Sequence, residues 1–181
     1  MKRLIAMILS LSMILSLAAC GGGKNDQVEI TLPATFFEDE DMSDFDAAAY
    51  AAENGFIDAK LNEDGSISIK MSKDKHEEMV ADMTKTLETN FSDMIGSDEM
   101  PFIKDIRHSD SFDSVSLVVD KDTYDTYGFV AMFIPLTIYV QTSMYQILAG
   151  EETRCEISFV DAATNETIES VTYPDALENA E

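Results

Sequence analysis

Three pairs of short segments constrain the fold of this chain most, because at least one segment of each pair has apolar residues at every second position. The pairs are 57–61 with 67–71, 102–107 with 115–119, and 154–160 with 167–173. Turn-forming residues separate the two members of each pair, and Gly65 and Asn165 among them suit a left-handed backbone. The alternation predicts three β-hairpins, each with one apolar and one polar face.

Helical spacing lies between the predicted hairpins. Apolar residues recur every three or four positions from Met79 to Met94, Asp74 and Glu77 form a capping-box pattern, and Gly96 follows as a stop. A helix of about 22 residues between the capping box and Gly96 would be about 33 Å long, enough to cross a sheet. A second long helix is predicted from Asp122 or Thr123 to near Gly150.

Two shorter elements are predicted near the start of the folded part. Residues 28–32 alternate as a first strand that ends at Pro33. A short helix should follow, capped by Ser43 or Asp44, stopped by Gly55, and buried on one side. The residues expected on that buried side are Phe45, Ala48, Ala49 and Ala52.

Hairpins and helices in this order predict an α+β fold. We expect one antiparallel sheet of about six or seven strands with the two long helices packed on one face.

Residues 128–150 carry no charge, so a membrane-spanning segment is the alternative to a core helix. Pro135 interrupts the segment early, and polar residues such as Thr142, Ser143 and Gln146 are unsuited to lipid. Acidic residues flank both ends, against the usual preference for basic cytoplasmic flanks. We therefore expect a buried core helix, with a partner-binding groove as the alternative.

The first residues have the three parts of a secretory signal. Lys2 and Arg3 precede an apolar run over 4–17, and Leu17, Ala18, Ala19 and Cys20 are followed by three glycines. This pattern resembles the lipobox of bacterial lipoproteins. The resemblance implies cleavage before Cys20, a diacylglyceryl thioether on its sulfur with fatty acyl chains such as palmitate, and a site on the extracytoplasmic face of the cell membrane. Two acyl chains bind a bilayer durably, whereas one binds only marginally.

The lipobox divides the chain into four parts. They are a signal peptide (1–19), a lipidated cysteine with a flexible tether (20–26), a single α+β domain (27–175) and an acidic tail (176–181).

The charge is strongly acidic, with 35 Asp and Glu against 12 Lys and Arg and a net charge of −23. Nucleic acid is excluded as a partner, since phosphate binding needs clustered basic residues. Anionic lipid headgroups should repel the folded part, so the expected membrane contact is the lipid anchor alone.

The sequence contains no recognisable catalytic or metal-binding motif. His76 and His108 lack a metal-ligand spacing, and Cys155 alternates with apolar residues on a predicted strand. Asp120–Asp122 resembles the start of a calcium loop, but Tyr124 and Asp125 break the pattern. The acidic run 38–46 is the remaining candidate for loosely bound calcium, and no other cofactor is expected.

Residues 28–37 (Val-Glu-Ile-Thr-Leu-Pro-Ala-Thr-Phe-Phe) and 173–177 (Tyr-Pro-Asp-Ala-Leu) resemble a group of small acidic lipoproteins of Gram-positive gut anaerobes. Some members are named after the N-terminal region of a streptococcal surface adhesin, antigen I/II. The resemblance implies no catalytic or binding residues.

The expected function is a lipid-anchored extracytoplasmic binding module of unknown ligand, and a non-enzyme is favoured over an enzyme. Two alternatives stay open. One is a small-ligand carrier with an apolar cavity lined by 129–148, beside Phe133 and Tyr139. The other is an envelope hydrolase that uses carboxylates such as Asp58, Asp105 or Asp120.

Overall fold

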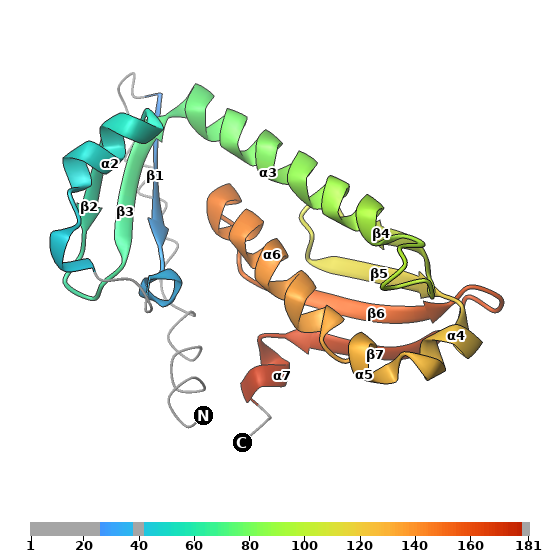
Figure 1. The fold of residues 1–181 in the computed structure, drawn as a ribbon. Helices are drawn as coiled ribbons and strands as arrows, with labels where there is room; N and C mark the ends of the chain where they lie inside the picture. The colour runs from blue at the N-terminus through green and yellow to red at the C-terminus, as the bar shows by residue number, and fades with distance from the viewer. Residues whose placement is uncertain (1–25, 38–41, 179–181) are drawn as a thin grey trace. The chain divides into compact units, whose positions relative to one another are not determined.

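The computed structural model describes residues 26–37 and 42–178, which form two compact units (Figure 1). Unit 1 holds the described residues up to Asp82 together with Ile147–Gly150, and unit 2 holds Met83–Gln146 and the residues from Glu151 onward. The fold is α+β, as predicted. The signal peptide, Cys20 and the tether up to residue 25 lie outside the described residues, as do 179–181 of the predicted tail. The single domain over 27–175 stays a prediction.

Unit 1 contains a three-stranded antiparallel sheet in the order β1-β3-β2. Its strands are β1 (Gln27–Leu32), β2 (Asp58–Leu61) and β3 (Ile67–Ser72). The predicted first hairpin is confirmed, and Ile67, Ile69 and Met71 are its buried residues on β3. At the turn, Gly65 has a φ of 83°, and the Asp64 carboxylate accepts hydrogen bonds from the Ser66 amide and hydroxyl. These bonds lower the pKa of Asp64.

Three helical pieces of unit 1 follow β1 in the chain and precede β2. They are the 3-10 turns Ala34–Phe36 and Met42–Asp44 and the helix α2 (Ala47–Asn54). Asp46 caps α2 by accepting from the amides of Ala48 and Ala49, so the predicted caps Ser43 and Asp44 are wrong. Gly55 ends the helix with a φ of 70°, as predicted.

The predicted buried side of α2 is also wrong. Ala51 is the buried residue of this helix, whereas Ala48, Ala49 and Ala52 are exposed. Moving the start of the helix by two or three residues rotates its inward face, because each residue turns the helix by about 100°.

The long helix α3 (Lys73–Met94) is confirmed, and its residues belong partly to unit 1 and partly to unit 2. Its first turn is capped by the Ser72 hydroxyl, which accepts from the Lys75 amide at 3.2 Å, two positions before the predicted cap Asp74. Within unit 2, the buried residues of α3 are Leu87 and Phe91.

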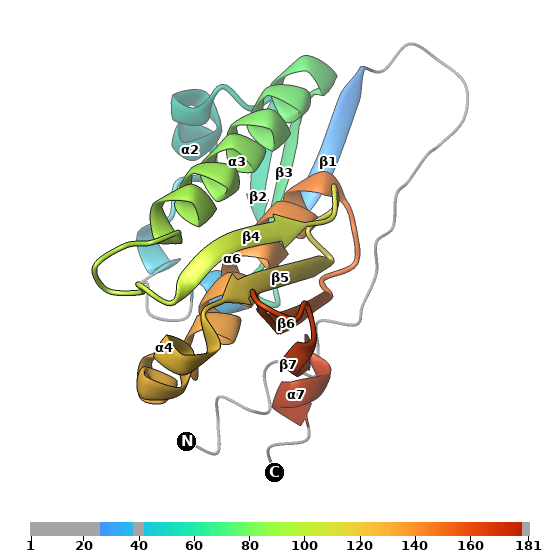
Figure 2. The ribbon, with the colours of Figure 1, turned by 90° about the vertical axis from the view of Figure 1, so that its right-hand side faces the viewer.

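Unit 2 contains a four-stranded sheet in the order β4-β5-β6-β7 (Figure 2). The strands are β4 (Ile103–His108), β5 (Ser114–Val119), β6 (Cys155–Asp161) and β7 (Thr167–Tyr173). The two hairpins β4–β5 and β6–β7 are confirmed, and Asn165 has a φ of 58° in the turn of the second.

The prediction of one antiparallel sheet is wrong in two respects. The strands form two separate sheets, and β5 pairs with β6 in parallel. The helical segment between these strands explains the parallel pairing, since a long crossover carries the chain from the end of β5 back to the end of the sheet at which β5 began.

The crossover consists of α4 (Lys121–Thr126), α5 (Gly128–Ala131) and α6 (Ile134–Ala149). Pro135 lies in the first turn of α6, where its missing amide removes no helical hydrogen bond, so the helical segment is interrupted just before it. A short helix, α7 (Asp175–Glu178), follows β7.

The core of unit 2 lies on one face of its sheet. Val115 and Leu117 of β5 pair with Ile157 and Phe159 of β6, and all four side chains are buried. Polar groups occupy the opposite face, where the hydroxyls of Ser116 and Ser158 are 2.9 Å apart. The predicted division into one apolar and one polar face is therefore confirmed for these strands.

Candidate functional site

An unusual row of exposed apolar side chains runs along α5 and α6 in unit 2. We call this row the apolar stripe, and its members are Phe129, Val130, Met132, Phe133, Leu136, Val140 and Met144. Phe129 is 76% exposed, Met132 61% and Phe133 51%. From Phe133 to Met144 the spacings are three or four residues, which places these side chains along one side of α6.

The opposite side of the same segment is buried and contains polar residues. Ile138 and Tyr139 are packed in the core, but so are Thr142, Ser143 and Gln146. The hydroxyls of Thr142 and Ser143 donate to carbonyls one turn earlier in the helix, and Gln146 bonds to backbone outside it. The polar residues are thus satisfied inside, while large apolar residues face outward.

The expectation of a buried core helix is therefore confirmed for one side only. Gly128–Ala149 is long and apolar enough to cross a membrane by length and composition, and 44% of its most apolar window is buried. The core helix of a soluble protein meets the same criterion. Of the polar residues that argued against lipid contact, Thr142, Ser143 and Gln146 face inward, so these three carry no weight for the outer side, whereas Thr137 is exposed.

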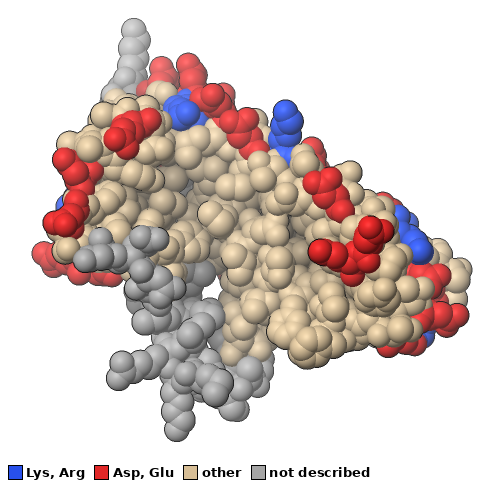
Figure 3. All heavy atoms as spheres, in the orientation of Figure 1, with Lys and Arg blue, Asp and Glu red and all other residues tan. Residues whose placement is uncertain are grey.

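The molecular surface shows the same contrast between charged and uncharged regions. In Figure 3, acidic side chains gather along α3, whereas the visible surface over α5 and α6 is mostly free of charged residues. Patches of this kind on a soluble protein commonly mark an interaction site.

A groove adjoins the apolar stripe at the end of the sheet. We call it the β7 groove, and its volume is about 470 Å³. The sheet contributes Ile157 and Phe159 from β6 and Glu169, Ser170, Val171 and Tyr173 from β7. The helical side contributes Tyr124, Gly128, Met132 and Pro135. Met132 belongs to both the groove and the apolar stripe, so the two form one continuous binding face.

Glu169 is the one charged residue that lines the β7 groove. The Tyr124 hydroxyl donates to its Oε1 at 2.5 Å. Burial and this hydrogen bond raise the pKa of Tyr124, so the phenol stays protonated and acts as a donor. The carboxylate keeps further acceptor positions, because two oxygens offer about four lone-pair directions.

The cavity expected beside Phe133 and Tyr139 lies elsewhere. Tyr139 stacks on Tyr173 with ring centroids 4.9 Å apart, and Phe133 faces outward. The groove is displaced toward β7, where Met132 and Pro135 form its helical wall.

The residues of the predicted lipobox, Leu17, Ala18, Ala19 and Cys20, lie outside the described residues. Cys155 lies on β6 and is fully buried, and burial raises the pKa of its thiol to about 11. The thiol is therefore protonated at neutral pH, which suits a core position and is unfavourable for a nucleophile.

The two histidines have structural contacts in different units. In unit 1, the His76 ring donates from Nε2 to the carbonyl of Leu148 at 2.7 Å. In unit 2, the His108 ring stacks on Phe112 with centroids 4.5 Å apart, and its Nδ1 donates to the Ser109 carbonyl.

The three carboxylates suggested for hydrolysis are not assembled into a pair by any contact in the described parts of the chain. Asp58 lies on β2 of unit 1, whereas Asp105 pairs with Arg107 at 3.1 Å on β4 of unit 2. Asp120 caps α4 by accepting from the Thr123 amide and hydroxyl, and these bonds lower its pKa. A general acid needs the opposite shift.

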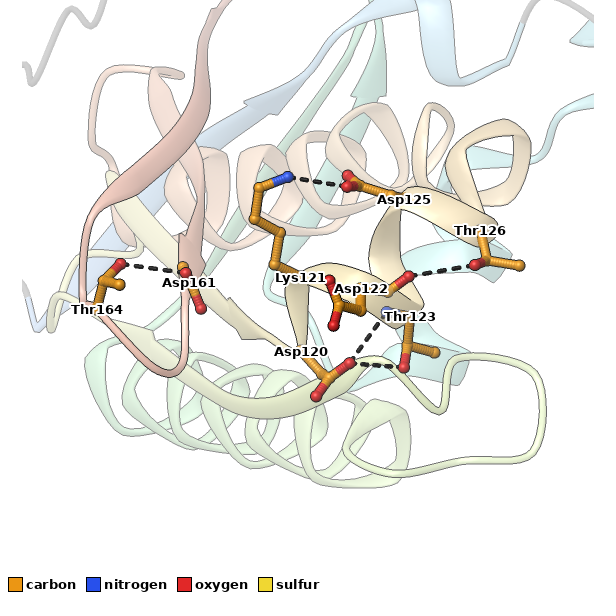
Figure 4. Close-up of polar contacts among 8 residues, drawn as sticks. All are labelled: Asp120, Lys121, Asp122, Thr123, Asp125, Thr126, Asp161 and Thr164. Atoms are coloured by element: carbon orange, nitrogen blue, oxygen red, sulfur yellow. Dashed lines mark hydrogen bonds and ion pairs between the residues drawn. The ribbon is translucent and has the colours of Figure 1, made fainter.

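Of the residues that resemble the start of a calcium loop, Asp120 caps α4 and Lys121 pairs with Asp125 at 2.9 Å (Figure 4). On the nearby β6–β7 turn, Asp161 accepts from the Thr164 hydroxyl. Across residues 26–37 and 42–178, no three His, Cys, Asp or Glu side chains are arranged to hold a metal ion. Part of the acidic run 38–46, the other calcium candidate, lies outside the described residues.

A second hollow, of about 260 Å³, lies in unit 1. Its lining mixes both signs of charge, with Glu29 and Asp58 beside Lys60 and Lys70. This mixture selects no particular ligand charge, and the β7 groove is the better-defined site.

Comparisons of this chain with protein-family models, with curated proteins and with solved structures each give no match. The apolar stripe and the β7 groove are therefore the features that bear on function.

The apolar composition of 129–148 is visible in the sequence, but its periodicity does not show which of these residues face outward. Apolar residues occur on nearly all sides of 129–148, so no single face stands out as the inner one. The β7 groove had no local signal, because its lining comes from five separate elements, α4, α5, α6, β6 and β7.

Proposed function

We propose that this chain is a lipid-anchored extracytoplasmic protein whose folded part is a binding module. The apolar stripe and the β7 groove are its binding face. The observation that carries the binding role is the outward orientation of Phe129, Met132 and Phe133 on a helical segment that buries Thr142 and Gln146. The motif at Leu17–Cys20 supports the anchor and the location.

Covering the exposed side chains of the apolar stripe with a partner is energetically more favourable than leaving them in water. Covering apolar surface stabilises a complex by about 25 cal/mol per Å² of area removed from water, before the costs of association. Large side chains that are more than half exposed therefore offer substantial binding energy.

A small-ligand carrier is the second candidate. The volume of the β7 groove, about 470 Å³, falls within the usual range for small-molecule sites. A ligand of this kind would combine an apolar body with a group that donates to Glu169.

Replacing Cys20 with serine tests the anchor. We expect the wild-type protein in the membrane fraction and the Cys20→Ser protein in the soluble or secreted fraction, because the acyl chains are lost. Cell fractionation with immunoblotting, together with mass spectrometry of the N-terminus, measures the result. Equal membrane retention of both proteins would contradict the anchor.

A photo-cross-linking amino acid at Phe133 tests the binding face in intact cells. We expect a discrete adduct from this position and none from Glu88, an exposed position on α3 of the same unit. Gel shift and mass spectrometry identify the adduct. No adduct at Phe133, or the same adducts from both positions, would count against a binding role for the apolar stripe.

A further inference from the structure

The β7 groove lies beside a strand whose outer backbone edge is free. β7 is the last strand in the order β4-β5-β6-β7, and it pairs with β6 only. Within the part of the chain that the structure describes, no strand pairs with its other edge. A free edge presents a row of amide and carbonyl groups that an added strand can bond.

The groove is placed to receive side chains from such a strand. Glu169, Val171 and Tyr173 pair across the sheet with Phe159, Ile157 and Cys155, so they share the face that carries the core. The helical wall stands over this face through Met132 and Pro135. Alternate side chains of a strand added beside β7 would enter the space between this wall and the sheet.

The charge around the groove favours a basic occupant. Glu169 is its one charged lining residue, and no lysine or arginine among the described residues forms an ion pair with it. The whole chain has a net charge of −23, which would attract a basic segment over a distance of about 10 Å at moderate ionic strength.

The same charges disfavour two other occupants. A second copy of this chain would bring equal negative charge to the interface. A membrane surface is disfavoured because surface-binding helices usually carry Lys or Arg on their polar face, and residues 128–150 contain neither.

We infer that the β7 groove binds an extended segment of a partner protein in which apolar residues alternate with lysine or arginine. The segment adds to the free edge of β7, its apolar side chains pack against Met132 and Val171, and one basic side chain pairs with Glu169. This inference rests on the proposed function and names the class of partner.

A dye-labelled peptide that alternates valine and lysine is the probe, and the full chain as isolated from cells is the receptor. Fluorescence anisotropy measures affinity, and hydrogen exchange measures the protection of the β7 amides. We expect saturable binding together with slower exchange along β7, because the added strand bonds the free edge. Peptides with glutamate in place of lysine, or with N-methylated backbone amides, should bind at least about tenfold more weakly, a loss of about 1.4 kcal/mol.

Matched variants locate the site. Met132→Ser should weaken binding about tenfold, whereas Ile95→Ser, at an exposed apolar residue of the same unit that belongs to neither the apolar stripe nor the groove lining, should leave it unchanged. Glu169→Gln should weaken binding about threefold to tenfold and reduce its dependence on salt.

Three results would overturn the inference. They are no saturable binding, equal binding of the N-methylated peptide, and preference for a helical peptide of the same composition. If these occur while Phe133 still yields a discrete adduct in cells, the binding module stands and the strand-like partner is wrong. Peptide binding without any cellular adduct would support the groove and contradict the proposed function.

Discussion

Replacing Gln146 with leucine is expected to lower the free energy of unfolding by about 3 kcal/mol. Gln146 is fully buried in unit 2, and its Nε2 donates to the carbonyls of Arg154 at 2.8 Å and Ser111 at 3.3 Å. Its Oε1 accepts from the Arg154 amide at 3.1 Å. Leucine has a similar volume but no polar atoms, so two buried carbonyls lose their partner at about 1–3 kcal/mol each, partly offset by the added apolar surface.

Urea denaturation followed by circular dichroism measures this change. The matched control is Gln141→Ala on the same helix, whose side chain accepts from Asn90 at the exposed surface. We expect a change of less than about 0.5 kcal/mol there. Equal stability of the two variants would show that the Gln146 bonds do not hold α6 to the chain that flanks β5 and β6.

Replacing Phe112 with alanine is expected to cost about 3–5 kcal/mol. The Phe112 ring is 1% exposed and lies edge-on to Tyr145 at 4.8 Å, in a cluster with Phe91 and His108. Its removal leaves a cavity among side chains from α3, α6 and the β4–β5 hairpin. Thermal and urea unfolding measure the loss.

The backbone of Phe112 provides an internal control, because its φ is 54°. Alanine keeps the cost of this left-handed conformation, whereas glycine does not. Phe112→Gly should therefore be about 1 kcal/mol more stable than Phe112→Ala. The reverse order would contradict the assigned conformation of the turn.

The elements of this fold were predictable where one local rule decides the structure. Alternation located the hairpins, because side chains on a strand point to opposite faces in turn. The 3.6-residue period and Gly96 located α3. Cap positions failed by two or three residues at α2 and by two at α3, since Ser, Asp and Glu near a helix start compete as caps and only the folded backbone selects one.

The association of the strands was beyond local rules. No sequence feature within 114–119 or 155–161 indicates that these segments pair in parallel, because that pairing depends on the path of the crossover between them. Phe112 is a comparable case: its position after a turn is visible in the sequence, but neither its positive φ nor the packing of its ring against Phe91 and Tyr145 from distant segments is visible there.

The sequence by itself determined the acidic charge, the lipobox pattern, the hairpins and the length of α3, since each depends on neighbouring residues, whereas the second long helix predicted over 122–150 is divided into α4, α5 and α6. Tertiary structure alone decided that the strands form two sheets, that Thr142, Ser143 and Gln146 face inward, and that Phe129, Met132 and Phe133 face outward. A segment that is apolar on nearly all sides has no intrinsic inner face. Its orientation is set by which backbone groups of β6 and the β4–β5 hairpin need hydrogen-bond partners, and Gln146 supplies them.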